Sequence, residues 1–308
     1  IFEELNKFNQ TYTDKTFYVN MVNCNVPQRF IANDENIHYP ELVAIYEKLV
    51  NDIKFDKTVS MTIYPLMIDE ETGKPKLHPK HLQSLKYDSE AAIATDAEMY
   101  FFIQTMPFRT THRKPSLVDI YFQVNAGLAF GAKGVQYFCY RTPDPNWEFN
   151  QEQYAMVLKD GTKTDIYYSV KEVNNWLGNL APHYLDLKYV RTFAHKNNFH
   201  KESTETFDEF CNTNFVSDFV ASMYSTEDVI CGEFVDKVGK TALFLVNYNE
   251  PTIQNKNYIE ISLKDKNIYK LTIISKNGEY QVSRFNDKFS ILLDKGEGLL
   301  ALACYDKE

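Results

Sequence analysis

Acidic side chains in the loops after strand-like segments are the first candidates for chemistry in this sequence. Carboxylates act as general acids, general bases and nucleophiles, so two of them in one cleft form a catalytic arrangement. The loop carboxylates are Asp34, Glu35, Asp69, Glu70, Glu71, Asp144, Glu148 and Glu152. Asp69 and Asp144 follow their strand ends most closely, so we favour these two as catalytic candidates. A solvated surface position is the alternative for both.

Polar and aromatic side chains at the predicted strand ends form a second set, which is suited to binding. Hydroxyl-rich ligands need fixed donors and acceptors on a concave surface, and an aromatic ring can stack on a sugar face. The predicted substrate-binding residues are Asn20, Asn23, Tyr64, Gln104, Arg109, Tyr140 and Trp147. A structural hydrogen bond is the alternative for Asn20 and Gln104, and packing within a loop is the alternative for Trp147.

The sequence contains no clear signal for a metal or a cofactor. His78 and His81 are three residues apart near a helix start, but no third ligand is evident. The five cysteines show no CxxC spacing, and an odd number cannot all pair within one chain. Neither a GxGxxG nor a P-loop sequence is present. We therefore expect no metal and no cofactor, and the redox compartment stays open.

The elements that would position these residues alternate between strand and helix in the first two-thirds of the chain. A helical pattern fills each interval between strands, and another follows the fourth strand. Ser116 can cap the third of these helices, with Asp119 supplying negative charge in its first turn. A polar loop is expected over 67–79. Repeated βα units predict a parallel sheet, and its strands are expected at 16–22, 58–64, 99–105 and 135–140.

From about residue 187 the pattern changes to short alternating runs. We predict eight strands and no helix there, with Asn277-Gly278 as a two-residue hairpin turn. Such a run of short strands is typical of an antiparallel β-sandwich. The predicted domains are therefore residues 1–186 and 187–308.

Charge and composition exclude two classes of partner. The net charge of −9 argues against a nucleic-acid partner, because phosphate binding needs a basic surface. No apolar run approaches the length of a membrane span. The chain begins at Ile1 without a signal-peptide pattern, so we expect a piece of a longer protein, and a secreted or periplasmic location stays open.

The segment NAGLAFGAKGVQYFCY at 125–140, with Arg141-Thr142-Pro143 after it, resembles the last strand of a group of bacterial glycoside-hydrolase-like barrels. This group is related to the β-galactosidase-type enzymes of the large retaining (β/α)8 clan. YVNMV at 18–22, IYP at 63–65 and FFIQT at 101–105 resemble its fifth, sixth and seventh strands in order. Later, GEF at 232–234 and GEGLL at 296–300 resemble the β-sandwich that commonly follows such barrels.

The resemblance implies a fold class of α/β plus all-β: a partial TIM (β/α)8 barrel with strands five to eight, followed by an antiparallel β-sandwich. The chain would begin at about the fourth barrel helix, over 1–8. A half-barrel cannot cover its own sheet edges, so the implied partner is the missing N-terminal half-barrel or a second copy of the chain.

The resemblance also implies an active site at the carboxyl ends of the strands. Retaining glycosidases use two carboxylates about 5 Å apart, which the related clan takes from strands four and seven. Strand four lies outside this sequence, and strand seven ends in Gln104-Thr105. The acidic residue and histidine that often precede Tyr-Pro in the group are Thr62 and Ile63 here.

We expect a glycoside hydrolase, or a segment of one, that acts on the O-glycosidic bonds of a carbohydrate at the barrel mouth. The alternatives are a catalytically degenerate barrel that binds carbohydrate and a structural or assembly module.

Overall fold

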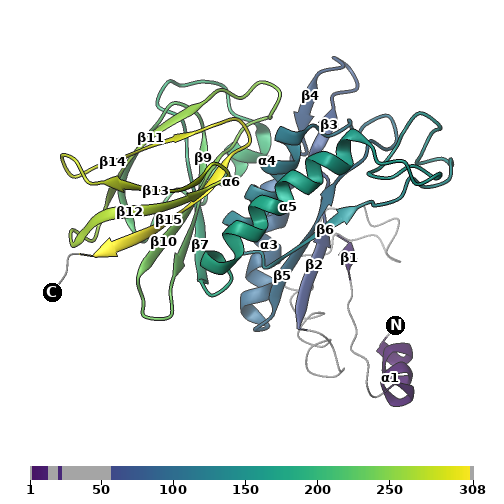
Figure 1. Ribbon diagram of the computed structural model, residues 1–308, viewed down its shortest axis with the longest axis horizontal. Helices are drawn as coiled ribbons and strands as arrows, with labels where there is room; N and C mark the ends of the chain where they lie inside the picture. Colours follow the sequence, from purple (N-terminus) through teal and green to yellow (C-terminus); the bar gives the residue numbers. More distant parts are fainter. Residues whose placement is uncertain (1, 13–19, 23–56, 306–308) are drawn as a thin grey trace.

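The structure is a computed structural model that describes residues 2–12, 20–22 and 57–305. It is a mixed helix-and-strand protein that begins with helix α1 (Phe2–Thr11) (Figure 1). Among the described elements, helices and strands are mixed up to residue 187, and strands dominate after it. Over the described residues, no helix is both long and apolar enough to cross a membrane.

A four-stranded parallel sheet forms the N-terminal layer, in the order β1-β2-β5-β6. Its strands are β1 (Met21–Val22), β2 (Thr58–Thr62), β5 (Glu98–Gln104) and β6 (Gly134–Phe138). Three predicted strands are thereby confirmed, whereas most of the one predicted at 16–22 lies outside the described residues. Over the described residues, β1 and β6 are the two edges, so this sheet is open and does not close into a barrel.

Three helices pack against this sheet: α3 (His81–Ala94), α4 (Leu117–Ala129) and α5 (Asp165–Tyr184) (Figure 1). The helix predicted from Pro40 lies outside the described residues. The predicted cap of α4 is confirmed, because Ser116 Oγ accepts from Asp119 N at 3.3 Å. The Asp119 carboxylate in turn accepts from Ser116 N at 2.7 Å. This reciprocal pair satisfies two N–H groups that a helix start leaves without partners.

Helix α4 is buried on most of its surface because it lies between the parallel sheet and the C-terminal strands (Figure 1). On one side, Gly127 lies directly against the ring of Phe101 from β5. On the other side, the carbonyl of Ala129 accepts a hydrogen bond from Thr192 Oγ1 at 2.7 Å and leaves no room for a side chain at Gly232. Most residues of a helix enclosed on both sides are apolar, as they are here, and the buried Gln123 and Asn125 form hydrogen bonds.

The segment 67–79 is not the irregular polar loop that the sequence suggests. Strands β3 (Leu66–Ile68) and β4 (Pro75–Leu77) pair there as an antiparallel hairpin. The turn is held by Asp69, which accepts from Thr72 N at 2.9 Å. Leu66 and Leu77 are buried at the base of the hairpin, so one apolar pair anchors an otherwise polar segment.

The C-terminal region contains two antiparallel sheets, with the orders β13-β12-β15-β10-β9-β7 and β14-β11-β8. Their strands are β7 (Lys188–His195), β8 (Val220–Ser225), β9 (Val229–Val235), β10 (Thr241–Asn247), β11 (Asn257–Leu263), β12 (Ile268–Ser275), β13 (Gly278–Ser283), β14 (Phe289–Leu293) and β15 (Gly298–Tyr305). The two sheets share one apolar cluster, to which Leu245 and Ile261 contribute from opposite sheets. A hairpin joins β12 and β13 as predicted, but its two turn residues are Lys276 and Asn277 rather than Asn277 and Gly278. Gly278 begins β13, pairs with Ser275 and has φ +111.

Two features contradict the prediction of eight strands without a helix. A ninth strand, β15, lies between β10 and β12 in the larger sheet. Helix α6 (Glu205–Cys211) is only 7 residues long and buries Phe207 and Phe210. A helix of two turns is too short to produce a recognisable periodic pattern.

The two regions share part of their core. One apolar cluster joins residues of α3, α4 and α5 to residues of β9 and β10, such as Phe234 and Phe244. Tyr184, near the end of α5, contacts both of these rings, at 5.4 and 5.9 Å between centroids. The domain boundary at residues 186 and 187 stays a prediction.

Candidate functional site

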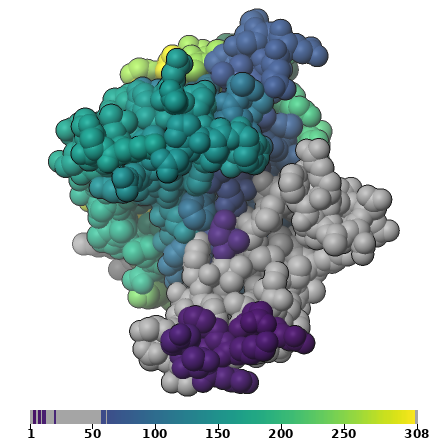
Figure 2. All heavy atoms as spheres, turned by 90° about the vertical axis from the view of Figure 1, so that its right-hand side faces the viewer, coloured from purple at the N-terminus to yellow at the C-terminus, as the bar shows by residue number. Residues whose placement is uncertain are grey.

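A pocket of about 560 Å³ lies at the carboxyl edge of the parallel sheet. It is bounded by residues that follow β2, β5 and β6, together with Met67 and His78 from the β3–β4 hairpin and its continuation. Figure 2 shows this side of the molecule, with the hairpin in blue and the loop after β6 in teal. The lining residues are Asn20, Thr62, Ile63, Tyr64, Met67, His78, Phe108, Arg109, Thr111, His112, Phe138, Glu148 and Phe149.

Aromatic rings form one wall of the pocket. Tyr64 lies 5.2 Å from Phe108 and 5.4 Å from Phe138 between ring centroids, and Phe108 stacks on His112 at 4.0 Å. Phe149 extends the wall beyond Phe138, at 6.1 Å. Burial raises the pKa of Tyr64 far above its usual value, so the phenol stays neutral and its O–H remains a donor.

Asn20 is held at the pocket by two neighbouring strand residues. Its Nδ2 donates to Thr62 Oγ1 at 2.7 Å, and its Oδ1 accepts from Ser60 Oγ at 2.9 Å. Gln136 of β6 donates to the same Ser60 hydroxyl at 3.2 Å. This chain of side-chain hydrogen bonds runs across the parallel sheet and fixes the orientation of the Asn20 amide.

Arg109 and Glu148 join two of the loops that border the pocket. Arg109 Nη2 donates to Glu148 Oε1 at 2.5 Å, and Arg109 N donates to Glu148 O at 2.6 Å. The guanidinium carbon also lies 4.9 Å from the centre of the Trp147 ring. Glu148 is the only carboxylate among the described residues that line the pocket.

Two histidines at the pocket are neutral near pH 7. Burial lowers the pKa of His112 to about 4, and the charge of Arg109 acts in the same direction. Burial also lowers the pKa of His78, assisted by Lys80 and Lys76. Each neutral imidazole has one donor and one acceptor nitrogen, so both rings can bind hydroxyl groups without adding charge.

The structure brings three of the predicted binding residues together and separates the others. Asn20, Tyr64 and Arg109 line the pocket, whereas Tyr140 and Trp147 are exposed and lie outside its lining. Gln104 is fully buried, and its Nε2 donates to the carbonyls of Met106 and Arg113. This is the structural hydrogen bonding that the sequence left open as the alternative. Asn23 lies outside the described residues.

The favoured catalytic candidates do not reach the pocket. Asp69 closes the β3–β4 turn and accepts a hydrogen bond from Lys76 at 2.9 Å. This bond contributes most to lowering the pKa of Asp69. Asp144 is exposed and bonds to Lys159 at 2.5 Å, which lowers its pKa as well. A carboxylate that stays ionised in this way is a poor proton donor.

Phe108 and His112 line the pocket but were not among the predicted site residues; both lie in the loop of the predicted Arg109. Glu148 was one of the predicted loop carboxylates, but it was not one of the two favoured ones. The position of these loops at the carboxyl ends of strands was the available signal, but it does not say which side chains turn inward. Within the described residues, no three His, Cys, Asp or Glu side chains gather as metal ligands.

Comparisons with known proteins identify the fold. No protein-family model matches the chain, and no curated protein matches it. A catalytic-mutant structure of Gan42B, a GH42 β-galactosidase from G. stearothermophilus, matches with a TM-score of 0.52 and 8% identity, over 84% of this chain and 60% of that one. The chain therefore has a fold like that of this glycoside hydrolase.

Two further structures are similar at lower scores. An Anoxybacillus α-amylase matches with a TM-score of 0.47 and 10% identity, over 100% of this chain and 56% of that chain. A glycoside hydrolase family 5 protein from Bacteroides vulgatus matches with 0.45 and 10% identity, over 99% and 74%. The chain thus spans less than two-thirds of the length of both the Gan42B and the amylase chains.

Proposed function

We propose that this protein binds a carbohydrate in the pocket at the carboxyl edge of its parallel sheet. The observation that carries the proposal is the combination of a ring wall with orientated polar groups in one pocket of about 560 Å³. The apolar face of a sugar packs on rings such as Tyr64 and Phe108. Its hydroxyl groups match the amide of Asn20, the guanidinium of Arg109 and the neutral ring of His112.

The glycoside-hydrolase-like fold supports the same proposal, because ligands of barrel proteins bind at this edge of the sheet. We take β1, β2, β5 and β6 as strands five to eight of a barrel, and the two antiparallel sheets as the following β-sandwich. Among the described strands, β1 and β6 are the open edges, and on this assignment they require a partner that continues the sheet. The proposed partner is an N-terminal half-barrel or a second copy of this chain.

Sedimentation of the purified chain distinguishes these two partners. A concentration-dependent dimer supports self-association, and a monomer that forms a complex with a co-expressed N-terminal half-barrel supports the other. A monomer that binds neither would contradict the partial-barrel assignment.

Hydrolysis of a glycosidic bond is the second candidate function. It is favoured by the carboxylate of Glu148 in the described pocket lining. A retaining mechanism needs a second carboxylate about 5 Å away, and the described part of the pocket lining offers none besides Glu148. The carboxylate position implied by the resemblance on strand seven is Gln104, which is fully buried and bonded to two carbonyls. Binding without turnover therefore fits the described geometry better than hydrolysis.

A saccharide panel titrated by calorimetry against the full chain tests the proposed binding. For any saccharide that binds, Arg109→Ala should weaken the affinity about tenfold or more, because a lost charged hydrogen bond costs about 1.5–3 kcal/mol. Arg284→Ala is the matched control, since the Arg284 side chain contacts the carbonyl of Lys266 and the carboxylate of Asp287 and is not part of the pocket lining. Affinity that is unchanged by Arg109→Ala, or a panel without any binding, would refute the proposal.

Aryl glycosides assayed with the same protein decide between the two functions. Turnover that Glu148→Gln abolishes would establish hydrolysis. Binding without turnover would establish a carbohydrate-binding barrel.

A further inference from the structure

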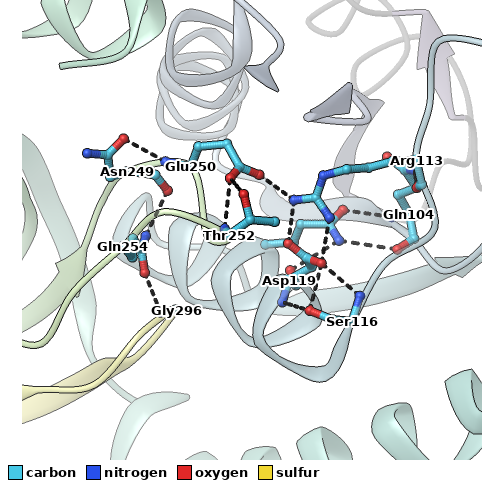
Figure 3. Close-up of polar contacts among 10 residues, drawn as sticks. Gln104, Arg113, Ser116, Asp119, Asn249, Glu250, Thr252, Gln254 and Gly296 are labelled. Carbon is cyan, nitrogen blue, oxygen red and sulfur yellow. Dashed lines mark hydrogen bonds and ion pairs between the residues drawn. The ribbon is translucent and has the colours of Figure 1, made fainter. Parts of the chain in front are cut away.

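A buried ionic cluster lies beside the loop that carries much of the pocket wall (Figure 3). Arg113 Nη1 and Nη2 donate to the two oxygens of Asp119 at 2.7 and 2.6 Å. Arg113 Nη2 also donates to Glu250 Oε1 at 2.5 Å. The Arg113 side chain is 10% exposed, and those of Asp119 and Glu250 are 1% and 3% exposed.

The three charged residues come from three different elements. Arg113 directly follows the segment 108–112, which supplies Phe108, Arg109 and His112 to the pocket. Asp119 belongs to the capped first turn of α4. Glu250 lies after β10, between that strand and β11, in the C-terminal region. A contact of Glu250 with Arg113 therefore joins the C-terminal region to the pocket loop.

The Glu250 carboxylate and backbone are also held by residues of the segment that follows β10. Its Oε2 accepts from Thr252 N at 2.7 Å and from the Thr252 hydroxyl, and its own N donates to Asn249 Oδ1 at 2.7 Å. Gln254 continues the network by donating to Asn249 O at 2.7 Å and accepting from Gly296 N at 2.5 Å (Figure 3). The carboxylate thus has one fixed position relative to the C-terminal strands.

Charge balance alone does not require Glu250. Asp119 already forms a bidentate ion pair with Arg113, which neutralises the guanidinium charge. A second buried carboxylate leaves the cluster with one excess negative charge, which the N-terminus of α4 offsets only in part. Burying an excess charge is unfavourable, so charge pairing does not account for Glu250. Its contribution to the cluster is geometric, because it fixes where Arg113 and its loop lie.

We infer that Glu250 is a positioning residue for the pocket, acting through Arg113 on the loop that carries Phe108, Arg109 and His112. Gln104 is a second anchor that holds both ends of the loop, because its Nε2 donates to Met106 O at 3.3 Å and to Arg113 O at 2.7 Å. Removal of Glu250 would leave this anchor and the Asp119 pair in place. The loop would then shift without unfolding. The affinity of the pocket for its ligand would fall, an expectation that rests on the proposed function.

Fluorine NMR of protein labelled with 5-fluorotryptophan tests the loop position without any ligand. The chain has two tryptophans, which Trp147→Phe assigns. Trp147 lies against Arg109 of the loop, and Trp176 is buried beside Tyr121. We expect Glu250→Ala to shift the Trp147 resonance and leave the Trp176 resonance in place, with a smaller shift for Glu250→Gln, which retains an acceptor for Arg113.

The matched control is Glu233→Ala. Glu233 is also a fully buried glutamate of the C-terminal region, but it accepts from the N–H groups of Asp218 and Phe219, both at 2.9 Å, far from the pocket loop in the sequence and in the fold. It should leave the Trp147 resonance unchanged. If Glu250→Ala does not fold, Thr252→Val, which removes one of the groups holding Glu250, provides the same comparison.

The ligand measurement separates this inference from the proposed function. For a saccharide that binds, Glu250→Ala should weaken the affinity about threefold to tenfold, a typical coupling for a residue outside the site. A Trp147 shift with no saccharide binding would uphold the positioning role and refute the proposed function. A Trp147 resonance that stays in place in all Glu250 and Thr252 variants would overturn the positioning role.

Discussion

Two glycines in helices, Gly127 and Gly178, provide a quantitative test of how α4 packs against the parallel sheet. Alanine is better than glycine inside a helix by about 0.8–1.0 kcal/mol, so both Gly→Ala changes gain this amount. A Cβ on Gly127 would lie 2.5 Å from Cε2 of the Phe101 ring and closer still to Cζ, whereas a Cβ on Gly178 would meet nothing within 4 Å. Overpacking of this kind costs about 1–3 kcal/mol or more, and this site is at the upper end because the Cζ end of the ring points directly at the glycine.

We therefore expect Gly127→Ala to lower the free energy of unfolding by about 2 kcal/mol. Gly178→Ala should raise it by up to about 1 kcal/mol. Urea unfolding followed by circular dichroism measures both values. The double variant Gly127→Ala, Phe101→Leu has a smaller side chain at position 101 and should recover part of the lost stability. Residues in contact do not contribute additively. Equal stability of the two alanine variants would refute the packing of α4 on β5.

Three further changes test the cap, the ionic cluster and the pocket histidine. Ser116→Ala should lower the free energy of unfolding by about 1 kcal/mol in urea, and an unchanged value would mean that the cap does not form. Arg113→Leu strands Asp119 and Glu250 as buried charges and should cost about 3–5 kcal/mol, so a variant within about 1 kcal/mol of the parent would argue against the cluster. The pKa of His112 is lowered from 6.5 to about 4 by burial, so the unfolded chain binds a proton that the folded chain does not. Stability from this residue is thus complete above pH 6.5 and falls as the pH drops toward 4, by about 1–3 kcal/mol in all. His112→Gln should flatten urea midpoints measured across this window, and an identical pH dependence would contradict the burial of the ring.

Local patterns explain what could be predicted from the sequence. The strands β2, β5 and β6 follow from short apolar and β-branched runs, and the cap of α4 follows from Ser116 and Asp119 at the required spacing. The existence of the β12–β13 hairpin follows from Asn277-Gly278, although the two turn residues lie one place earlier, because few residues other than glycine adopt the φ of +111 that Gly278 has. In each case, the residues that determine the structure are neighbours in the chain.

Long-range contacts explain what could not be predicted. Gln104 was expected at the pocket because it ends a strand, but carbonyls of the following loop satisfy its amide inside the protein. Glu148 received less weight than Asp69 and Asp144, yet it lines the pocket, since the loop after β6 folds back on Arg109. Sequence spacing does not show which residues a loop of this length will contact. The aromatic wall around Tyr64 depends on the same folding of the loop against its neighbours.

The most direct test of carbohydrate binding at the pocket is a titration of the 5-fluorotryptophan-labelled chain with a saccharide that binds in calorimetry. Trp147 contacts Arg109, which lines the pocket, whereas Trp176 is buried against Tyr121 and Phe244. Binding at the pocket predicts a saturable shift of the Trp147 resonance with the calorimetric affinity, and an unchanged Trp176 resonance. A saccharide that binds while the Trp147 resonance stays unchanged would place the site elsewhere and contradict the assignment.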